Sequence, residues 1–159
     1  IKSHNVMMTV EGEVKLIDLG LVADVKNGIS TMRGILGTTY WIPPEMIRGE
    51  PHSYGADIWS LGICLLELCH GYPPNRDNKL RALFLAGAGI APCLEKRTSW
   101  SQKCNDFFSD CLVPEQTERP SAAELLAHPW LKTRCTLEKI RRRLKEVFMA
   151  DAPESAGFF

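Results

Sequence analysis

Two short apolar runs lie near the start of the chain, at residues 6–10 and 13–17, and in the second Val14 and Leu16 alternate with Lys15 and Ile17. Successive side chains of a strand point to opposite faces, and short apolar runs of this kind predict two strands. Gly12 lies between the runs, and a glycine-containing turn is typical of a β-hairpin. We therefore expect a hairpin whose open ends carry Asn5 and Asp18.

Residues 20–40 contain Gly, Ser and Thr without a sustained period, which predicts a long loop, and such loops are usually functional or disordered. Pro43 and Pro44 then prevent a helix from beginning before Glu45. Residues 56–70 are apolar almost all round, which predicts a helix buried on every side.

Further helices follow from capping signals and apolar stripes. One helix begins at Asp77 and carries Leu80, Leu83 and Phe84 on one face. Two capping boxes are predicted, at Ser99–Gln102 and Ser121–Glu124. The stripe after the first box consists of Trp100, Cys104, Phe107, Phe108 and Cys111, and Leu125, Leu126 and Trp130 follow the second.

Residues 133–159 predict a basic amphipathic helix with a frayed tail at 151–159. The apolar stripe consists of Leu137, Ile140, Leu144, Val147 and Phe148, and the basic face of Lys139, Arg141, Arg142, Arg143 and Lys145. Two interpretations stay open: a solvated helix that caps the domain, or a helix that binds a partner or a membrane surface.

Composition narrows the class of protein. A chain of 159 residues can bury one sizeable core. The formal net charge of +0 gives no argument for a nucleic-acid partner, and we expect none. No apolar run reaches the ~20 residues that a membrane-spanning helix needs. With no signal peptide at its start, the chain is expected to be cytoplasmic and to have no transmembrane segment.

The six cysteines do not form a metal-binding or redox pattern, because Cys-x-x-Cys is absent and no histidine spacing completes a zinc site. Cys64, Cys69, Cys104 and Cys111 lie among apolar residues at helical spacing. We expect them to be small buried hydrophobes in a reducing compartment, with a redox or metal role as the alternative.

The chemistry-bearing residues gather around the predicted hairpin. Lys2 precedes Asn5 by three residues, and Asp18-Leu19-Gly20 follows the second strand. Amide and carboxylate oxygens suit Mg²⁺, and a hairpin fixes the distance between the two ligands at its ends. Together these residues resemble the catalytic loop and the Asp-Phe-Gly motif of protein kinases, which hold the metal of bound ATP.

Three further motifs continue the resemblance in the same order. Residues 37–45 are similar to Gly-Thr-Pro-Tyr-Trp-x-Ala-Pro-Glu, and residues 57–62 to the buried central helix of the kinase domain. Arg119-Pro120 and residues 128–131 resemble the late helices. The chain thus resembles the C-terminal lobe of a eukaryotic protein kinase.

The resemblance implies a protein-kinase-like α+β fold, mainly α, with one small hairpin followed by a helical bundle and the N-lobe absent. It places a partial kinase domain, beginning inside the catalytic loop, at residues 1–132 and a separate basic helix and tail at 133–159. The catalytic aspartate of the family pattern would precede Ile1.

The chain is most similar to the PAK branch of the sterile-twenty-like kinases. Lys2 is the Ser/Thr-kinase form, and Ile1-Lys2-Ser3-x-Asn5 is similar to the Ile-Lys-Ser-Asp-Asn of that branch. Ser30-Thr31-Met32 and residues 80–85 also resemble branch patterns. Such kinases answer to small Rho-type GTPases through an N-terminal region, which would here be missing.

By position, the resemblance assigns ATP and Mg²⁺ as cofactors and gives each motif residue a role. Asn5 and Asp18 would hold Mg²⁺, and Lys2 would neutralise charge on the transferring γ-phosphoryl group. Thr38 would hydrogen-bond the catalytic-loop aspartate and lysine. Thr31 would be the activating phosphosite, ordering its loop by pairing with arginine.

Three other residues would be structural. Glu45 and Arg119 would form a buried ion pair, and Asp57 would brace the catalytic loop by accepting backbone N–H bonds. The alternative interpretations are that Asp18 is only a turn residue and that Thr31 is an ordinary loop threonine.

The chain also departs from the family pattern. Pro43 replaces alanine, and Thr39 replaces proline. The segment from Thr31 to Thr38 is longer than in the PAK branch, which leaves the phosphosite open. His4, where the branch has aspartate, is expected to face solvent.

The function implied is a serine/threonine kinase that transfers the ATP γ-phosphoryl group to Ser or Thr hydroxyls of protein substrates. The alternative is a truncated, non-catalytic, pseudokinase-like interaction module. Because the catalytic aspartate and the N-lobe would both lie upstream, we expect the 159-residue polypeptide alone to be inactive.

Overall fold

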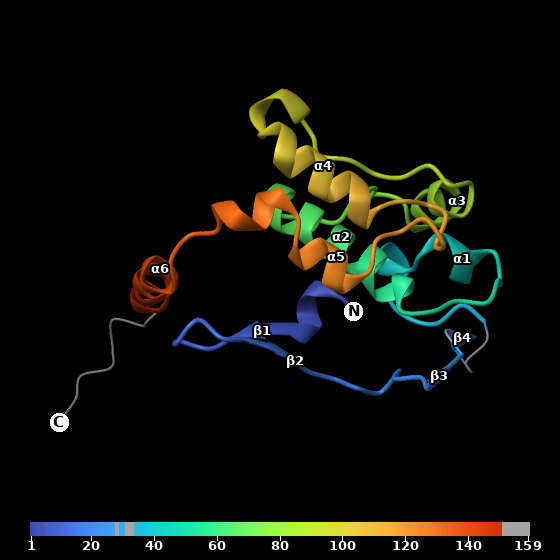
Figure 1. Cartoon of the computed structure of the whole chain (residues 1–159), viewed down its shortest axis with the longest axis horizontal. Helices are drawn as coiled ribbons and strands as arrows, with labels where there is room; N and C mark the ends of the chain where they lie inside the picture. The colour runs from blue at the N-terminus through green and yellow to red at the C-terminus, as the bar shows by residue number, and fades with distance from the viewer. Residues whose placement is uncertain (28, 31–33, 151–159) are drawn as a thin grey trace.

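The computed structural model describes residues 1–27, 29–30 and 34–150. Two small hairpins come first in the chain, and helices follow (Figure 1). The hairpins run along one side of the helical body, and the last helix, α6, stands apart from that body. The predicted order of a hairpin followed by helices is therefore confirmed.

The first hairpin pairs β1 (Val6–Met8) with β2 (Val14–Leu16) in antiparallel register. Its turn contains Gly12 in a left-handed conformation with φ 81°, which glycine adopts without a steric penalty. The backbone N–H of Ile17 donates to the carbonyl of Asn5 at 2.9 Å and extends the pairing to the open end. The hairpin predicted from the alternating pattern is confirmed.

A second hairpin lies within the segment predicted as a loop. It pairs β3 (Val25–Lys26) with β4 (Ile29–Ser30), and Ser30 N donates to the carbonyl of His52 at 2.7 Å. The prediction of a long loop over residues 20–40 is therefore wrong for these two strands. Strands of two residues are too short to show a period in the sequence.

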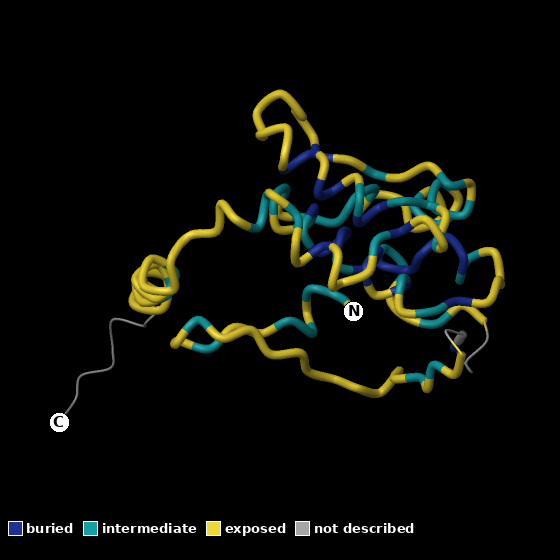
Figure 2. The backbone as a smooth tube through the Cα atoms, viewed as in Figure 1, coloured by how far each residue is buried: buried dark blue, intermediate teal, exposed yellow. Residues whose placement is uncertain are grey.

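The core forms around α2 (Gly55–His70), which packs against α4 (Gln102–Cys111) and the 3-10 helix η2 (Thr39–Trp41). Figure 2 shows the buried segments concentrated in this helical body. The helix ends at Gly71 in the left-handed conformation, with φ 80°. The largest fully buried core side chains include Trp59, Leu66 and Leu112.

The expectation that α2 is buried on every side is wrong, because Leu68 is 76% exposed. The helices α4 and η2 cover only part of its circumference. An all-apolar sequence identifies the helix but does not show how much of its surface finds a partner.

The short helix α1 (Pro44–Ile47) packs against α3 (Lys79–Gly87). The helix α3 begins after Asn78, whose side chain accepts from Arg81 N at 3.0 Å, so the prediction of a start at Asp77 is wrong. Asn78 has extended backbone angles and its carboxamide reaches the free N–H, which are the requirements of an N-cap.

Only one of the two predicted capping boxes exists. At Ser121, the hydroxyl accepts from Glu124 N and the Glu124 carboxylate accepts from Ser121 N, which starts α5 (Ala122–Leu126) as predicted. The box at Ser99 is wrong, because Ser99 ends the 3-10 helix η3 (Arg97–Ser99). Ser101 caps α4 instead, accepting from the N–H of Cys104 at 3.2 Å.

Two elements complete the chain. The 3-10 helix η4 (Pro129–Thr133) packs on α4, with the rings of Phe107 and Trp130 4.8 Å apart. The final helix α6 (Leu137–Ala150) confirms the predicted amphipathic helix. The predicted frayed tail at 151–159 lies outside the described residues. Within the part of the chain that the structure describes, no helix is long and apolar enough to cross a membrane.

A fully buried ion pair joins distant parts of the helical body. Arg119 donates to the two carboxylate oxygens of Glu45 at 2.9 and 3.1 Å, and both side chains are 0% exposed. The same guanidinium donates to the carbonyls of Val113 and Gly55, and lies 5.3 Å from the Trp59 ring centroid. These extra bonds offset the cost of removing both charges from water.

Three of the four cysteines expected to be buried are so: Cys64, Cys104 and Cys111, while Cys69 is half-buried. Burial raises the pKa of the Cys64 thiol to about 11 and that of Cys111 to about 12. The prediction that these residues act as small core hydrophobes is confirmed for those three. Cys93 and Cys135 are exposed.

We predict that Arg119→Met lowers the free energy of unfolding by about 3–5 kcal/mol, because it leaves the Glu45 carboxylate buried without its partner. Denaturant titration followed by circular dichroism measures this change. The matched control is Arg48→Met, which removes the partner of Glu50 in a pair that keeps contact with solvent. That control should cost at most about 1 kcal/mol, and equal costs for the two variants would contradict the account.

A thiol-labelling experiment tests the buried cysteines. At pH 8, Cys93 and Cys135 should react with a maleimide within minutes, whereas Cys64 and Cys111 should react only after unfolding. Their thiols are buried, and pKa values near 11 and 12 keep them protonated. Mass spectrometry of the labelled peptides identifies each labelled cysteine. Prompt labelling of Cys111 in the folded chain would contradict its buried position in the core.

Candidate functional site

The open ends of the first hairpin bring Asn5 and Asp18 together. Asn5 is the last residue of a 3-10 turn, η1 (Ser3–Asn5), and Asp18 follows β2 by two positions. The Asn5 side-chain nitrogen lies 3.5 Å from an Asp18 carboxylate oxygen, within hydrogen-bonding reach. The Ile17 N–H to Asn5 carbonyl bond fixes this proximity through the backbone.

Asp18 has an uncommon backbone conformation. Its φ is 62°, in the left-handed region that few residues other than glycine adopt. The backbone N–H of Gly20 donates to its other carboxylate oxygen at 3.2 Å, as in an Asx-turn. Asp18 is thus a turn residue by geometry, and the turn also orients its carboxylate beside Asn5.

The donor set fits a magnesium ion bound together with a nucleotide. Mg²⁺ takes one or two protein carboxylate or amide oxygens and fills its other positions with water and phosphate oxygens. Among the described residues, no cluster of three or more His, Cys, Asp or Glu side chains could hold a metal ion by itself. A pair such as Asn5 and Asp18 therefore needs water or phosphate oxygens to complete the coordination.

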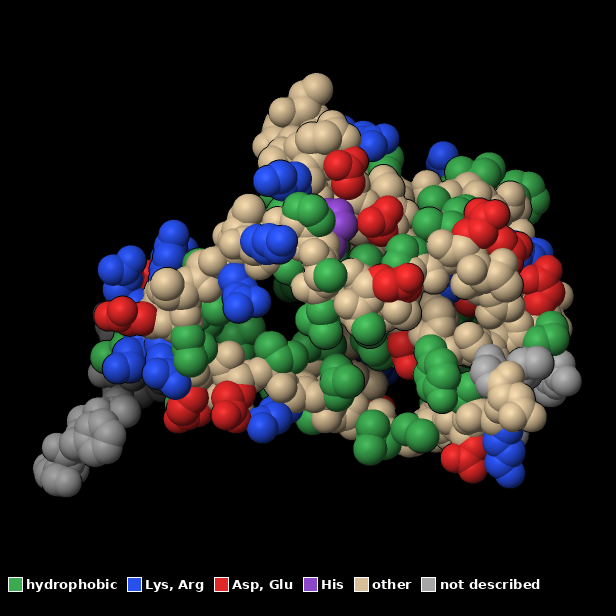
Figure 3. All heavy atoms as spheres, viewed as in Figure 1, with side chains coloured by type: hydrophobic (Ala, Val, Ile, Leu, Met, Phe, Trp, Pro, Cys, Tyr) green, Lys and Arg blue, Asp and Glu red, His purple; other side chains and the backbone are tan. Residues whose placement is uncertain are grey.

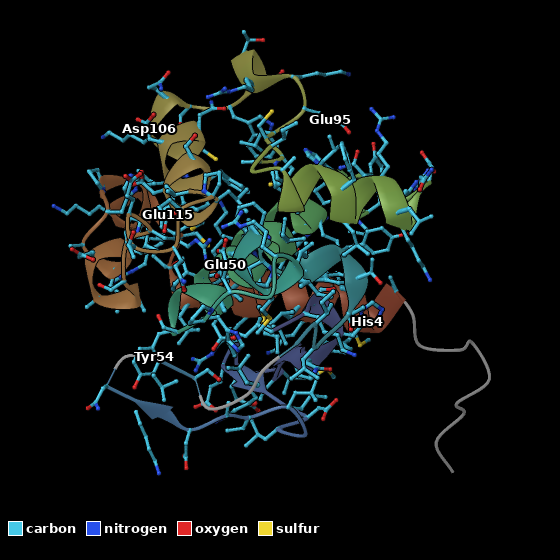
Figure 4. All side chains as sticks on the ribbon, turned by 90° about the vertical axis from the view of Figure 1, so that its right-hand side faces the viewer. His4, Glu50, Tyr54, Glu95, Asp106 and Glu115 are labelled. Atoms are coloured by element: carbon cyan, nitrogen blue, oxygen red, sulfur yellow. The ribbon has the colours of Figure 1, made fainter. Side chains whose placement is uncertain are left out.

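A cavity of about 400 Å³ opens beside this pair. Its lining includes five of the residues singled out in the sequence: Lys2, Asn5, Asp18, Thr38 and Asp57. The strands and the segment after them form one wall, and η2 and the start of α2 form the other. His4 and Tyr54, labelled in Figure 4, lie on the side of the helical body nearest the strands.

Lys2 and Thr38 both line the cavity. Lys2 precedes η1 and is half-buried, whereas Thr38 is exposed and precedes η2, where its carbonyl accepts from Trp41 N at 3.0 Å. The hydrogen bonds of the described residues include none between the two side chains. The structure therefore brings both residues to one cavity without joining them.

Asp57 lies beside the first residue of the chain. Its carboxylate is 3.6 Å from the backbone nitrogen of Ile1, and its side chain is 64% exposed. Asp57 lies in the first turn of α2 and lines the cavity, so the space beside it is open.

Two other sequence predictions have different outcomes. Thr31, the predicted phosphosite, lies outside the described residues. His4 is exposed, as expected, although its ring makes an edge contact with Trp41 at a centroid distance of 6.1 Å.

Sequence reasoning missed part of the cavity wall. His52 is buried and lines the cavity, and its carbonyl anchors β4. Trp41 and Ser60 line it as well, joined by a 2.7 Å bond from the Ser60 hydroxyl to the Trp41 carbonyl. His52 lies between two helices in a segment without periodicity, so the sequence carried no signal for it.

Comparison with known proteins supports one family. The family model described as protein kinase domain matches residues 1–131. The chain is 37% identical over 151 residues to the probable serine/threonine-protein kinase mkcC of Dictyostelium discoideum, covering 95% of this chain and 17% of that protein. It is 42% identical over 136 residues to the serine/threonine-protein kinase pakC of the same organism, covering 85% of this chain and 28% of that protein.

A relative from an animal gives the same result. The chain is 41% identical over 133 residues to the serine/threonine-protein kinase max-2 of Caenorhabditis elegans, covering 83% of this chain and 20% of that protein. The chain thus spans less than a third of the length of each relative named here. With the family model matching most of its length, the chain belongs to the protein kinase family.

Proposed function

We propose that residues 1–132 form the C-terminal lobe of a serine/threonine protein kinase and supply its metal and phosphate contacts. The observation that carries this proposal is the Asn5–Asp18 pair, held 3.5 Å apart at the open end of a hairpin beside a cavity lined by Lys2. The substrates are proteins that present Ser or Thr hydroxyls. The separate basic helix and tail occupy residues 133–159.

Each site residue has a defined role in the proposed reaction. Bound Mg²⁺ would offset the negative charge of the ATP phosphates, and Asn5 and Asp18 would hold it through their side-chain oxygens. The Lys2 ammonium would stabilise charge on the transferring phosphoryl group. Thr38 would hydrogen-bond the loop that carries Lys2.

We further place the chain in the PAK branch, with Thr31 as the activating phosphosite. The sequence from Ile1 to Asn5 and residues 80–85 support this placement. Regulation by a small Rho-type GTPase would then act through an N-terminal region of the whole protein, which would work in the cytoplasm.

A non-catalytic interaction module is the second candidate function. It is favoured by exposed apolar side chains on the segment after β2: Leu19, Leu21 and Val22. An apolar surface of this kind is typical of a site that meets another protein or another part of the same protein. In the kinase proposal, the same surface would meet the N-lobe.

The kinase proposal predicts that Asp18→Asn lowers phosphoryl transfer by at least about 100-fold, because the substitution removes an anionic metal ligand while keeping the side-chain shape. The assay uses the longest polypeptide that contains this chain, with ATP, Mg²⁺ and a basic serine peptide. Glu13→Gln is the matched control, since Glu13 is an exposed carboxylate on the same hairpin. Undiminished transfer by Asp18→Asn would refute the assigned role.

The 159-residue polypeptide expressed alone should transfer no phosphate. Its residues include no assigned catalytic base, and one wall of the cavity is open to solvent, so positioning and charge stabilisation both fail. Incorporation of radiolabelled phosphate into the same peptide measures this. Incorporation that disappears in the Asp18→Ala variant would show that the polypeptide is catalytically complete.

A further inference from the structure

The turn of the first hairpin lies against α6, although the two are far apart in the sequence. The Arg141 guanidinium Nε donates to the carbonyl of Glu11 at 2.8 Å. A Cβ at Gly12 would lie 2.8 Å from Leu137 Cδ1 and 3.4 Å from Ile140 Cγ2. We call these five residues the turn contact, and its closeness explains why a glycine occupies position 12.

The hairpin needs such support. Its strands have three residues each, and both of its faces expose apolar side chains, with Leu16 57% exposed on one face and Met7 52% exposed on the other. A two-stranded hairpin without a covering layer is marginally stable in water. The described residues therefore give the hairpin support at its ends, from the backbone bond at Asn5 and from the turn contact.

The helix α6, in turn, docks on the hairpin and not on the helical body. Figure 1 shows it beside the hairpin turn and separated from the core helices. Its Ile140 side chain is half-buried in the turn contact, whereas Val147 and Phe148, further along the apolar stripe, remain about half exposed at 47% and 50%. Lys and Arg side chains gather over its outer surface (Figure 3).

We propose that α6 is a positioning helix for the metal site. The turn contact fixes one end of the β-hairpin whose other end carries Asn5 and Asp18, and so it limits how often the hairpin opens and the two ligands separate. This inference rests on the proposed function and extends it, because it gives the helix beyond the predicted kinase domain a role in metal binding. Arg141, Leu137 and Ile140 are its positioning residues.

The open alternatives for α6 differ in what its apolar stripe contacts. A helix that binds a membrane or a partner leaves the stripe free, whereas here Leu137, although 46% exposed, and the half-buried Ile140 contact the hairpin turn. Arg141, counted in the sequence among the basic surface residues, bonds to the hairpin backbone. The contacts favour an internal role for this end of the helix.

Amide hydrogen exchange of residues 6–17 tests the turn contact. In the longest polypeptide that contains this chain, Ile140→Asp and Arg141→Ala should speed hairpin exchange by at least about tenfold, because the hairpin opens more often, while α2 amides keep their rates. Ile140→Val keeps an apolar side chain and should behave like the unchanged protein. Arg142→Ala, on the opposite side of α6, is the second control. Unchanged hairpin exchange in Ile140→Asp would overturn the proposal.

Metal affinity tests the positioning role itself. Mn²⁺, with a non-hydrolysable ATP analogue present, should bind several-fold more weakly to Ile140→Asp than to Ile140→Val, as measured by electron paramagnetic resonance. Faster exchange with unchanged Mn²⁺ affinity would show a merely structural contact and overturn the proposal. Failure of the proposed function has a different signature: Asp18→Asn would then leave Mn²⁺ affinity unchanged, whatever the hairpin exchange shows.

Discussion

The buried ion pair between Arg119 and Glu45 is the interaction on which the helical body depends. It joins α1 to the loop before α5, and through the Gly55 carbonyl it also fixes the start of α2. Two charges that are removed from water must be fully paired, so these segments can occupy few relative positions. The ion pair therefore also fixes part of the cavity, because η2 and the first turn of α2 form one of its walls.

The opposite wall of the cavity, which contains the first hairpin, is held by much weaker interactions. Backbone pairing in a small hairpin brings Asn5 and Asp18 together, and a turn contact with α6 supports the far end. This contrast suits a site that binds a nucleotide and its metal: a rigid wall sets the position of the site, and a marginally stable hairpin presents the ligands. Local stability of this kind is what distant contacts can alter.

The sequence predicted the parts of the structure that depend on local pattern. The first hairpin, the central helix, the Ser121 capping box and α6 all follow from periodicity or capping chemistry. The errors concern short or tertiary features. The strands β3 and β4 are too short to show a period, and the choice of Ser101 over Ser99 depends on a 3-10 turn. Two further features depend on packing between residues far apart in the sequence, which no local pattern indicates. They are the position of His52 in the cavity wall and the turn contact.

The central claim is that the hairpin holds a metal–nucleotide complex between Asn5 and Asp18. The most direct test is the broadening of nuclear magnetic resonance signals by paramagnetic Mn²⁺. The sample is the longest polypeptide that contains this chain, with a non-hydrolysable ATP analogue. Broadening falls off steeply with distance from the ion. The account predicts that the Asn5 side-chain amide and the Gly20 backbone amide are broadened first, and that α4 amides are unaffected. Broadening elsewhere, with these two signals unchanged, would contradict it.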